Sequence, residues 1–191
     1  MKIGVLALQG AFKEHIDILT RLGVEVIEVR LGKNLEGLDG LVIPGGESTT
    51  IGKLAVLYDL VTPLRRFAES KAVWGICAGM ILMAKRIKGD QPRLGIMDMA
   101  VSRNAFGRQV DSFETGVMVD GLDGDTPVPF PAVFIRAPKV IETWGAASII
   151  ARLDHQTAVA VRQQRHLATA FHPELTCDPR LHQYFLKLVQ S

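Results

Sequence analysis

The segment GLVIPGGESTTIGKLAVLYDLVTPLRRFAESKAVWGICAGM (residues 40–80) contains the pattern that decides the fold. Its apolar runs at 40–46 and 72–77 are short and contain glycine, as expected for buried strands that end in turns. Between them, the spacing of apolar residues predicts helices at about 49–59 and 61–69. Strands joined through helices form right-handed crossovers, which place the strands parallel in one sheet.

The same alternation continues on both sides of this segment. KIGVLAL (2–8) predicts a first strand, and apolar residues at helical spacing from Phe12 predict a helix that stops at Gly23. VEVIEVR (24–30) alternates with a period of two residues, which is typical of a strand, and a helix is expected over 78–87. The first half is therefore predicted to form a parallel sheet with helices on both faces.

The second half of the chain is rich in strand-like runs with little helix between them. We expect a mixed or antiparallel extension of the sheet there. Asp178 followed by Pro179 predicts the start of a final helix that reaches about Val189. The predicted strands of this half lie at 95–101, 113–119, 132–137, 147–153, 158–163 and 167–172.

Composition limits the possible classes of function. The 191 residues carry a formal net charge of +2 and are 48% hydrophobic, which is typical of one globular domain, expected to span 1–191. No Lys/Arg run is dense enough for a nucleic-acid surface, and no apolar run approaches the roughly 20 residues that span a bilayer. Cys77 and Cys177 suggest neither a disulfide framework nor a zinc site, so we expect no metal and a cytoplasmic location.

Three predicted strands end in turns that contain glycine and polar residues. These turns are LALQG (6–10), VIPGGES (42–48) and WGICAG (74–79). Functional loops lie at the carboxyl ends of parallel strands, so the three turns are expected to meet at one edge of the sheet. We expect the chemistry of the protein at this edge.

GICAG (75–79) has the layout of a nucleophile elbow around Cys77. A sharp turn would hold the sulfur in a strained conformation, and small neighbours would let strand and helix pass closely. The helix N-terminus would then stabilise negative charge on sulfur and on an oxyanion. The alternative is a buried structural cysteine, because free cysteines are among the most buried residues.

A catalytic thiol needs a base, and His172 is the strongest candidate. It ends the apolar run LATAF and precedes Pro173, which favours an extended conformation in which Glu174 points the same way. Glu174 would then fix the imidazole tautomer, although a strand-end histidine beside an unrelated glutamate is the alternative. The remaining histidines are expected to be solvated at the surface: His15, His155, His166 and His182.

PGGEST (44–49) provides a turn that could bind an anion. Two glycines at a strand exit allow backbone N–H groups to face a tetrahedral intermediate, where one donor is worth about 3 kcal/mol of barrier. The simpler interpretation is a strand-to-helix turn with Ser48 or Thr49 as the helix cap, and the two are compatible.

Six motifs occur in an order and at separations that resemble one family. They are LALQGAFKEH (6–15), PGGESTT (44–50), GICAGMILMA (75–84), SRNAFGRQVDSFE (102–114), VFIRAP (133–138) and FHPELT (171–176). The chain resembles the glutaminase subunits of pyridoxal 5′-phosphate synthase, which belong to the class I (triad) glutamine amidotransferases. The resemblance covers the chain from Met1 to the final helix.

The resemblance implies a fold and a set of site residues. The fold is the three-layer, flavodoxin-like α/β fold of class I amidotransferases, with a central mixed, mostly parallel sheet and helices on both faces. Cys77 would be the nucleophile, His172 the base and Glu174 its orienting partner. The implied glutamine-binding residues are Gly46, Glu47, Ser48, Arg103, Ile135 and Arg136, and the implied oxyanion donors are the backbone N–H groups of Gly46 and Ala78. Cys177 matches no catalytic position.

The resemblance also implies a reaction and a partner. Glutamine would be hydrolysed to glutamate and ammonia through a cysteine thioester, without a cofactor. Ammonia would pass to a (β/α)8-barrel synthase subunit in a large hetero-oligomer, which combines it with ribose 5-phosphate and glyceraldehyde 3-phosphate. Docking of that subunit is implied to complete the oxyanion hole, and LQGAF (8–12) is our candidate for part of the docking edge, or else an ordinary turn into the first helix.

Two other functions remain to be weighed. An amidotransferase subunit for histidine or tryptophan biosynthesis is disfavoured by RNAFGRQ (103–109) and FIRAP (134–138). A non-catalytic regulatory module of the same fold is disfavoured because such relatives commonly lose the His-x-Glu pair, which is present here. Neither nucleic acid nor a membrane is expected as a partner.

Overall fold

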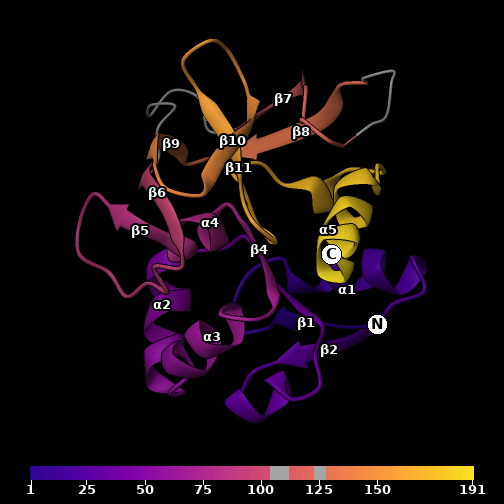
Figure 1. The fold of residues 1–191 in the computed structure, drawn as a ribbon, viewed down its shortest axis with the longest axis vertical. Helices are drawn as coiled ribbons and strands as arrows, with labels where there is room; N and C mark the ends of the chain where they lie inside the picture. The colour runs from indigo at the N-terminus through magenta and orange to yellow at the C-terminus, as the bar shows by residue number, and fades with distance from the viewer. Residues whose placement is uncertain (104–111, 123–127) are drawn as a thin grey trace.

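The computed structural model describes residues 1–103, 112–122 and 128–191 (Figure 1). The first half contains β1 (Lys2–Leu6), α1 (Phe12–Arg21), β2 (Glu25–Val29), the 3-10 turn η1 (Gly32–Leu35), β3 (Gly40–Ile43), α2 (Ser48–Leu57), α3 (Val61–Ala68), β4 (Ala72–Ile76) and α4 (Ala78–Met83). The second half contains β5 (Ala84–Ile87), β6 (Met97–Ser102), β7 (Ser112–Val117), β8 (Phe130–Ile135), β9 (Lys139–Thr143), β10 (Ala147–Arg152), β11 (Ala158–Gln163), β12 (His166–Thr169), the 3-10 turn η2 (Pro173–Leu175) and α5 (Arg180–Gln190).

The main sheet has the strand order β2-β1-β3-β4-β12-β11-β9-β6-β5, with β10 paired to β11. The strands from β2 to β12 are parallel, so their carboxyl ends lie at one edge as predicted. Beyond β12 the pairings of β11, β9 and β6 are antiparallel, which confirms the mixed extension expected for the second half. The last strand of the chain, β12, therefore lies at the centre of the sheet, between β4 and β11.

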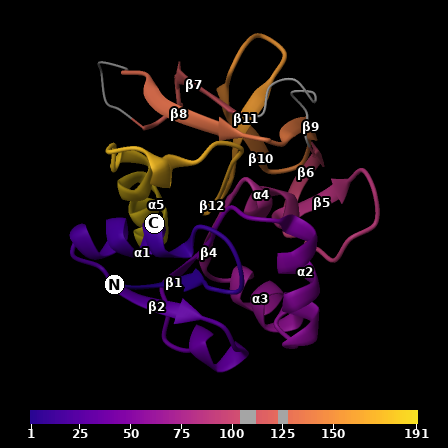
Figure 2. The same cartoon turned by 180° about the vertical axis from the view of Figure 1, so that it is seen from behind.

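Helices cover both faces of the parallel half. Figures 1 and 2 show α1 and α5 on one face and α2 and α3 on the other. The short helix α4 packs against α2. This arrangement confirms the predicted three-layer α/β fold. No helix in the described ranges is long and apolar enough to cross a membrane.

A separate hairpin of β7 and β8 covers the edge at which the parallel strands end (Figure 1). Its aromatic side chains explain this placement, because Phe134 stacks on Phe113 with ring centroids 4.7 Å apart and contacts Phe171 at 5.5 Å. The backbone N–H of His172 donates to the carbonyl of Val133 in β8, at 2.8 Å. The hairpin is thus fixed to the residue expected to be the base.

Several elements differ from the sequence-based expectation. The helix expected over 78–87 ends at Met83 and continues as β5, because every residue of α4 is buried and a fully apolar run hides its periodicity. Strand β9 was not predicted, since only Val140 of its five residues is buried and no alternation is visible. The strand expected over 167–172 ends at Thr169, so His172 lies beyond it.

The final helix begins one residue later than expected. Pro179 occupies the cap position, and the carboxylate of Asp178 accepts the backbone N–H of Arg180 at 3.0 Å. The aspartate therefore caps the helix from the residue before the proline.

Candidate active site

Cys77 lies in the turn between β4 and α4, with φ 49° and ψ −98°. A positive φ is unusual for a residue with a Cβ, so the surrounding structure must hold it. The backbone N–H of Cys77 donates to the carbonyl of Thr169 at 2.7 Å, which ties the elbow to the end of β12. The side chain is almost buried, with 8% of the residue exposed.

The glycines on either side of Cys77 are required by close backbone contacts. A Cβ on Gly75 would lie 2.6 Å from the carbonyl oxygen of Gly79, and a Cβ on Gly79 would lie 2.2 Å from that of Ile43 in β3. Neither site has room for a methyl group unless the backbone moves. The strand, the turn and the helix therefore pack in contact only because both residues lack side chains.

His172 and Glu174 form a buried pair beside the elbow. The His172 Nδ1 and Glu174 Oε1 atoms are 2.7 Å apart. The local conformation differs from the prediction, because residues Pro173–Leu175 form the turn η2 and not an extended strand. Proline at the start of η2 fits this turn, and the turn still brings the carboxylate back to the imidazole.

The electrostatics of this pair favour charge on both members. Burial alone would lower the pKa of His172, but the hydrogen bonds and charges of Cys77 and Glu174 outweigh burial and raise that pKa to about 10. Burial acts to raise the pKa of Glu174, yet the hydrogen bond from His172, the neighbouring His15 ring and the charge of His172 keep it below its ordinary value. At neutral pH the site therefore holds an imidazolium beside a carboxylate.

The prediction that the other histidines are solvated was wrong for three of four. His15 and His182 are fully buried and His166 is 7% exposed, whereas His155 is exposed as expected. His15 is three residues from Phe12 and four from Leu19, and His182 is three residues from Phe185. Each of these two therefore lies on the apolar stripe of its helix, a signal that could have placed it in the interior.

The PGG turn packs against the loop between β1 and α1. The carbonyl of Gly45 accepts the N–H of Ala11 at 3.1 Å, and the N–H of Glu47 donates to Gln9 Oε1 at 2.8 Å. A Cβ on Gly10 would lie 1.9 Å from the Gly45 carbonyl oxygen, so this contact requires glycine. Because a trans peptide directs its N–H opposite its C=O, the Gly46 N–H points away from Ala11.

A cavity of about 330 Å³ lies at this edge of the sheet. Every sequence-predicted site residue except Glu174, which lies behind His172, lines it. The lining residues are Gln9, Gly46, Glu47, Ser48, Cys77, Ala78, Ile81, Arg103, Ile135, Arg136 and His172. The predicted residues are thus brought together around one space of small-molecule size.

One wall of the cavity carries paired opposite charges. Arg103 Nη2 lies 3.2 Å from Glu47 Oε1. Burial disfavours the Glu47 carboxylate, but the combined hydrogen bonds from Thr49 and Thr50 outweigh it and lower its pKa to about 2. Arg136 also lines the cavity and has a left-handed backbone with φ 42°, so it is another strained residue beside the site.

Sequence reasoning missed Gln91, which holds two of these residues. Its Oε1 accepts the Ser48 hydroxyl at 3.2 Å and Arg103 Nη1 at 2.9 Å, while the residue is 6% exposed. It lies in the loop between β5 and β6, where no periodicity or motif marked it. Of the RNAFGRQ motif, only Arg103 lies within the described residues, since 104–109 fall outside them.

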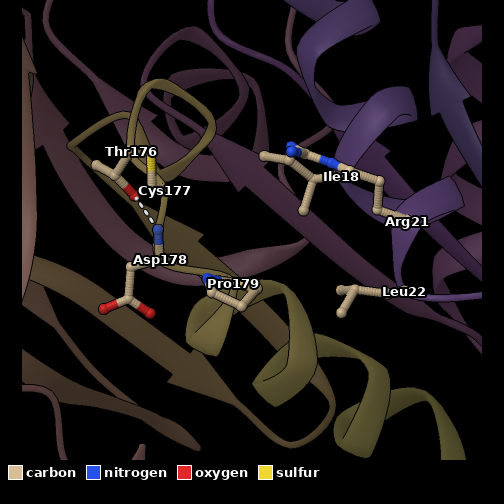
Figure 3. Close-up of a pocket in the computed structure, with 7 residues that line it drawn as sticks. All are labelled: Ile18, Arg21, Leu22, Thr176, Cys177, Asp178 and Pro179. Carbon is tan, nitrogen blue, oxygen red and sulfur yellow. Dashed lines mark hydrogen bonds between the residues drawn. The ribbon is translucent and has the colours of Figure 1, made fainter.

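Cys177 lies away from this edge. It is exposed, beside a cavity of about 200 Å³ between α1 and the segment that precedes α5, where it sits with Ile18, Leu22 and Pro179 (Figure 3). Its neighbours are largely apolar. Within the described ranges no group of three or more His, Cys, Asp or Glu side chains is arranged to hold a metal ion.

Residues 5–191 match the SNO glutamine amidotransferase family. The chain belongs to this family. It is 56% identical to "Pyridoxal 5'-phosphate synthase subunit PdxT" of Moorella thermoacetica over 99% of the chain and 100% of that protein. It is 55% identical to the protein of the same name from Thermus thermophilus, over 97% of the chain and 96% of that protein.

Solved structures agree with this membership. A crystal structure of a glutamine amidotransferase matches with a TM-score of 0.92 and 52% identity, over 99% of both chains. The structure of PurLQS from Thermotoga maritima matches over 97% of both chains, with a TM-score of 0.73 but 15% identity, which indicates a shared fold alone. The family member described here therefore has the amidotransferase fold.

Proposed function

We propose that this chain is the glutaminase subunit of a pyridoxal 5′-phosphate synthase, which hydrolyses L-glutamine to L-glutamate and ammonia. The proposal is supported by its family and by relatives named as subunits of that synthase. The observation that carries it is the buried His172–Glu174 pair, 2.7 Å apart, whose imidazole lines the same cavity as the elbow residue Cys77. We further propose that residues 1–191 act as one amidotransferase domain.

The proposed mechanism uses a catalytic triad of Cys77, His172 and Glu174. The Cys77 thiolate attacks the side-chain amide carbon and forms a tetrahedral oxyanion. When the C–N bond breaks, the His172 imidazolium gives its proton to the departing nitrogen, so ammonia leaves and a glutamyl thioester remains. The neutral imidazole then takes a proton from water, which attacks the thioester; the C–S bond breaks and glutamate is released. Glu174 keeps Nδ1 of His172 occupied throughout.

The cavity wall suits the two charges of a free amino acid. The Arg103 guanidinium would pair with the α-carboxylate of glutamine, and the Glu47 carboxylate, ionised above a pKa of about 2, would accept the α-ammonium group. The binding set would be completed by Gly46, Ser48, Ile135 and Arg136, which line the same cavity.

The oxyanion would be held by the backbone N–H groups of Gly46 and Ala78. The Ala78 N–H is the first of α4, where the helix leaves its amides without internal partners. The Gly45 carbonyl is held by Ala11, which supports a turn with the Gly46 N–H directed away from the β1–α1 loop. Two such donors stabilise the tetrahedral intermediate more than the planar amide.

The proposed partner is a (β/α)8-barrel synthase subunit that receives ammonia within a large hetero-oligomer. We propose a cytoplasmic location for the complex. The synthase subunit would dock at the edge where the parallel strands end, including LQGAF (8–12), and would there contact the loop that binds the Gly45 carbonyl. No cofactor, nucleic acid or membrane is part of this proposal.

Ammonia release from glutamine, measured with and without the synthase subunit, tests the function. Cys77→Ser is expected to abolish release, whereas Cys177→Ser, a matched change at the other thiol, is expected to retain it. Release by Cys77→Ser as fast as by the wild type would show that the mechanism is wrong. If neither the wild type nor any variant released ammonia with the synthase subunit present, the proposed glutaminase activity would be ruled out.

A further inference from the structure

A second cluster of buried polar side chains lies directly behind the His172–Glu174 pair. It consists of His15 on α1 and His182 on α5, both fully buried. His15 Nδ1 lies 3.0 Å from His182 Nε2. On its other side, His15 Nε2 lies 3.5 Å from Glu174 Oε2. Five side chains from Cys77 to His182 thus form one polar path into the interior.

The partners in this cluster are restricted. Glu174 uses Oε1 for His172, and its Oε2 has no hydrogen-bond partner within the described residues. The same is true of His15 Nε2 and His182 Nδ1. In the described part of the chain, the ring N of His15 is thus the polar atom that faces the second carboxylate oxygen. A buried carboxylate oxygen without such a group would be costly.

The contact between the two histidines determines where their protons lie. Burial lowers the pKa of His15. Burial, the neighbouring His15 ring and the charge of Arg21 lower the pKa of His182 to about 2, so both rings are neutral and carry one proton each. If His15 carried its proton on Nδ1, its bare Nε2 would face the Glu174 carboxylate, and the Nδ1–H of His182 would be buried without an acceptor. If His182 Nε2–H donates to His15 Nδ1, the His15 proton is on Nε2 and faces the carboxylate. The second arrangement leaves fewer unsatisfied groups.

We infer that His15 is a positioning residue for the proposed triad: its Nε2–H, 3.5 Å from the second oxygen of Glu174, stabilises the charge on that oxygen, and His182 fixes the tautomer that makes this possible. The inference rests on the proposed function, because it assigns Glu174 a role there. The triad is thus extended by two neutral imidazoles from helices on the same face of the sheet.

The surroundings of His15 keep this arrangement in place. Trp74 of β4 packs edge-on against both rings, with centroids 5.8 Å from His15 and 5.0 Å from His182. The titratable groups that face His15 are Glu14 on its own helix, Glu174 and His172 from the η2 segment, and His182 from α5; Arg21 of α1 acts on His182. Burial outweighs the acidic groups, so His15 stays neutral as the pH falls below 6.5.

The tautomer can be measured in the wild-type chain without any substitution. With ¹⁵N-labelled histidine, long-range ¹⁵N–¹H correlation spectra distinguish a ring protonated on Nε2 from one protonated on Nδ1. We expect His15 and His182 to be protonated on Nε2 at pH 7. A His15 ring protonated on Nδ1, or doubly protonated, would overturn the inference.

Substitutions test the consequence for catalysis, with the synthase subunit present. His15→Gln keeps an N–H near the Nε2 position, whereas His15→Leu has a similar bulk and no donor. For His15→Leu we expect kcat about tenfold lower and KM within about twofold of the wild type. Loss of the donor raises the pKa of Glu174, so the acid limb of the pH profile of kcat/KM should move up by about half a pH unit or more. His15→Gln should restore both toward wild-type values.

A purely structural role would give a different result. Thermal unfolding of His15→Leu would then shift while the acid limb of its profile stayed in place, and this outcome rejects the inference. If His15→Leu does not fold, His182→Leu is measured in its place, in the wild type and in the His15→Gln background. In the wild-type background, His182→Leu no longer fixes the His15 tautomer and should lower kcat. In the His15→Gln background the same substitution should leave kcat unchanged, because glutamine has no tautomer. Equal losses in both backgrounds reject the inference. If the wild type releases no ammonia while its tautomers are as expected, the proposed function has failed and the positioning geometry has not.

Discussion

His172 Nδ1 lies 2.7 Å from Glu174 Oε1 although the two residues flank Pro173 at the start of a 3-10 turn. The turn allows one backbone segment to carry both the base and its carboxylate. The adjacent hairpin contact, from His172 N–H to Val133 O, fixes the segment from the other side. The charge of Glu174 therefore acts on the imidazole of His172, a residue whose backbone has little freedom to move.

Replacing Glu174 with glutamine should separate its charge from its shape. Without the negative charge, the pKa of His172 falls from about 10 toward its ordinary value, so the imidazolium that protonates ammonia is lost at a lower pH. We expect kcat about a hundredfold lower and the alkaline limb of the pH profile displaced to lower pH. A pH series of ammonia release measures both; an unmoved alkaline limb would contradict the assignment.

Gln91→Leu should weaken glutamine binding more than it slows the reaction. The substitution removes the acceptor shared by Ser48 and Arg103, so the two side chains lose their fixed positions. A lost hydrogen bond of ~1.4 kcal/mol corresponds to about a tenfold higher KM. Gln91→Glu retains an acceptor oxygen at the same place and serves as the control. Steady-state kinetics with glutamine distinguish the two, and equal KM values would count against this role of Gln91.

Gly79→Ala should destabilise the fold, because its Cβ would lie 2.2 Å from a backbone oxygen of β3. The expected loss is about 1–3 kcal/mol in the free energy of unfolding. Gly32→Ala is the matched control, since its Cβ would meet Pro63 at an ordinary 3.4 Å. Urea unfolding of both variants checks the difference. If Gly79→Ala proved as stable as Gly32→Ala, the close packing of helix and strand would be in question.

Stability should fall as the pH is lowered from 6.5 toward 5. His15, His166 and His182 are buried, and burial lowers the pKa of each below 6.5, so the unfolded chain binds protons that the native chain does not. Each such group costs up to about 1.4 kcal/mol per pH unit in this window. His172, with a raised pKa, acts in the opposite direction: its stabilisation is complete below 6.5 and is lost as the pH rises through about 10.

The histidine contribution can be isolated with His166→Gln, which changes a buried ring far from the proposed triad. Its unfolding free energy should depend less steeply on pH between 6.5 and 5, because unfolding of the variant takes up about one proton fewer than unfolding of the wild type. Urea titrations at several pH values give this slope. A slope identical to that of the wild type would mean that His166 has the same pKa in the native and the unfolded chain.

The sequence predicted those features that local patterns record. Strand-helix alternation predicted the parallel half of the sheet. GICAG and His172 predicted residues that the structure places around one cavity, with Glu174 behind His172. Local patterns record these features because a strand exit, an elbow and a His-x-Glu pair each depend on neighbours in the chain. The hairpin that brings Ile135 to the cavity depends instead on contacts of Phe134 with Phe171, which are distant in sequence.

The misses share a physical origin in long-range contacts. Gln91 acts through Ser48 and Arg103, more than ten residues away on either side, so no local pattern marks it. His15 and His182 were assigned to the surface because histidine is usually polar and exposed, yet each occupies an apolar stripe and finds its polar partner on another helix. The spacing of apolar residues along a helix can show that a histidine is buried, but it does not show which side chain on another element forms its polar contact.

The central place of β12 has a consequence for synthesis of the chain. A ribosome delivers β1, β3 and β4 long before residues 166–169, yet this strand separates β4 from β11 in the finished sheet. Until it is inserted, the end of β4 lacks the carbonyl of Thr169 that anchors the Cys77 amide. A nascent chain that lacks residues 166–169 therefore lacks this anchor of the elbow, so the site can be completed only after β12 has been inserted.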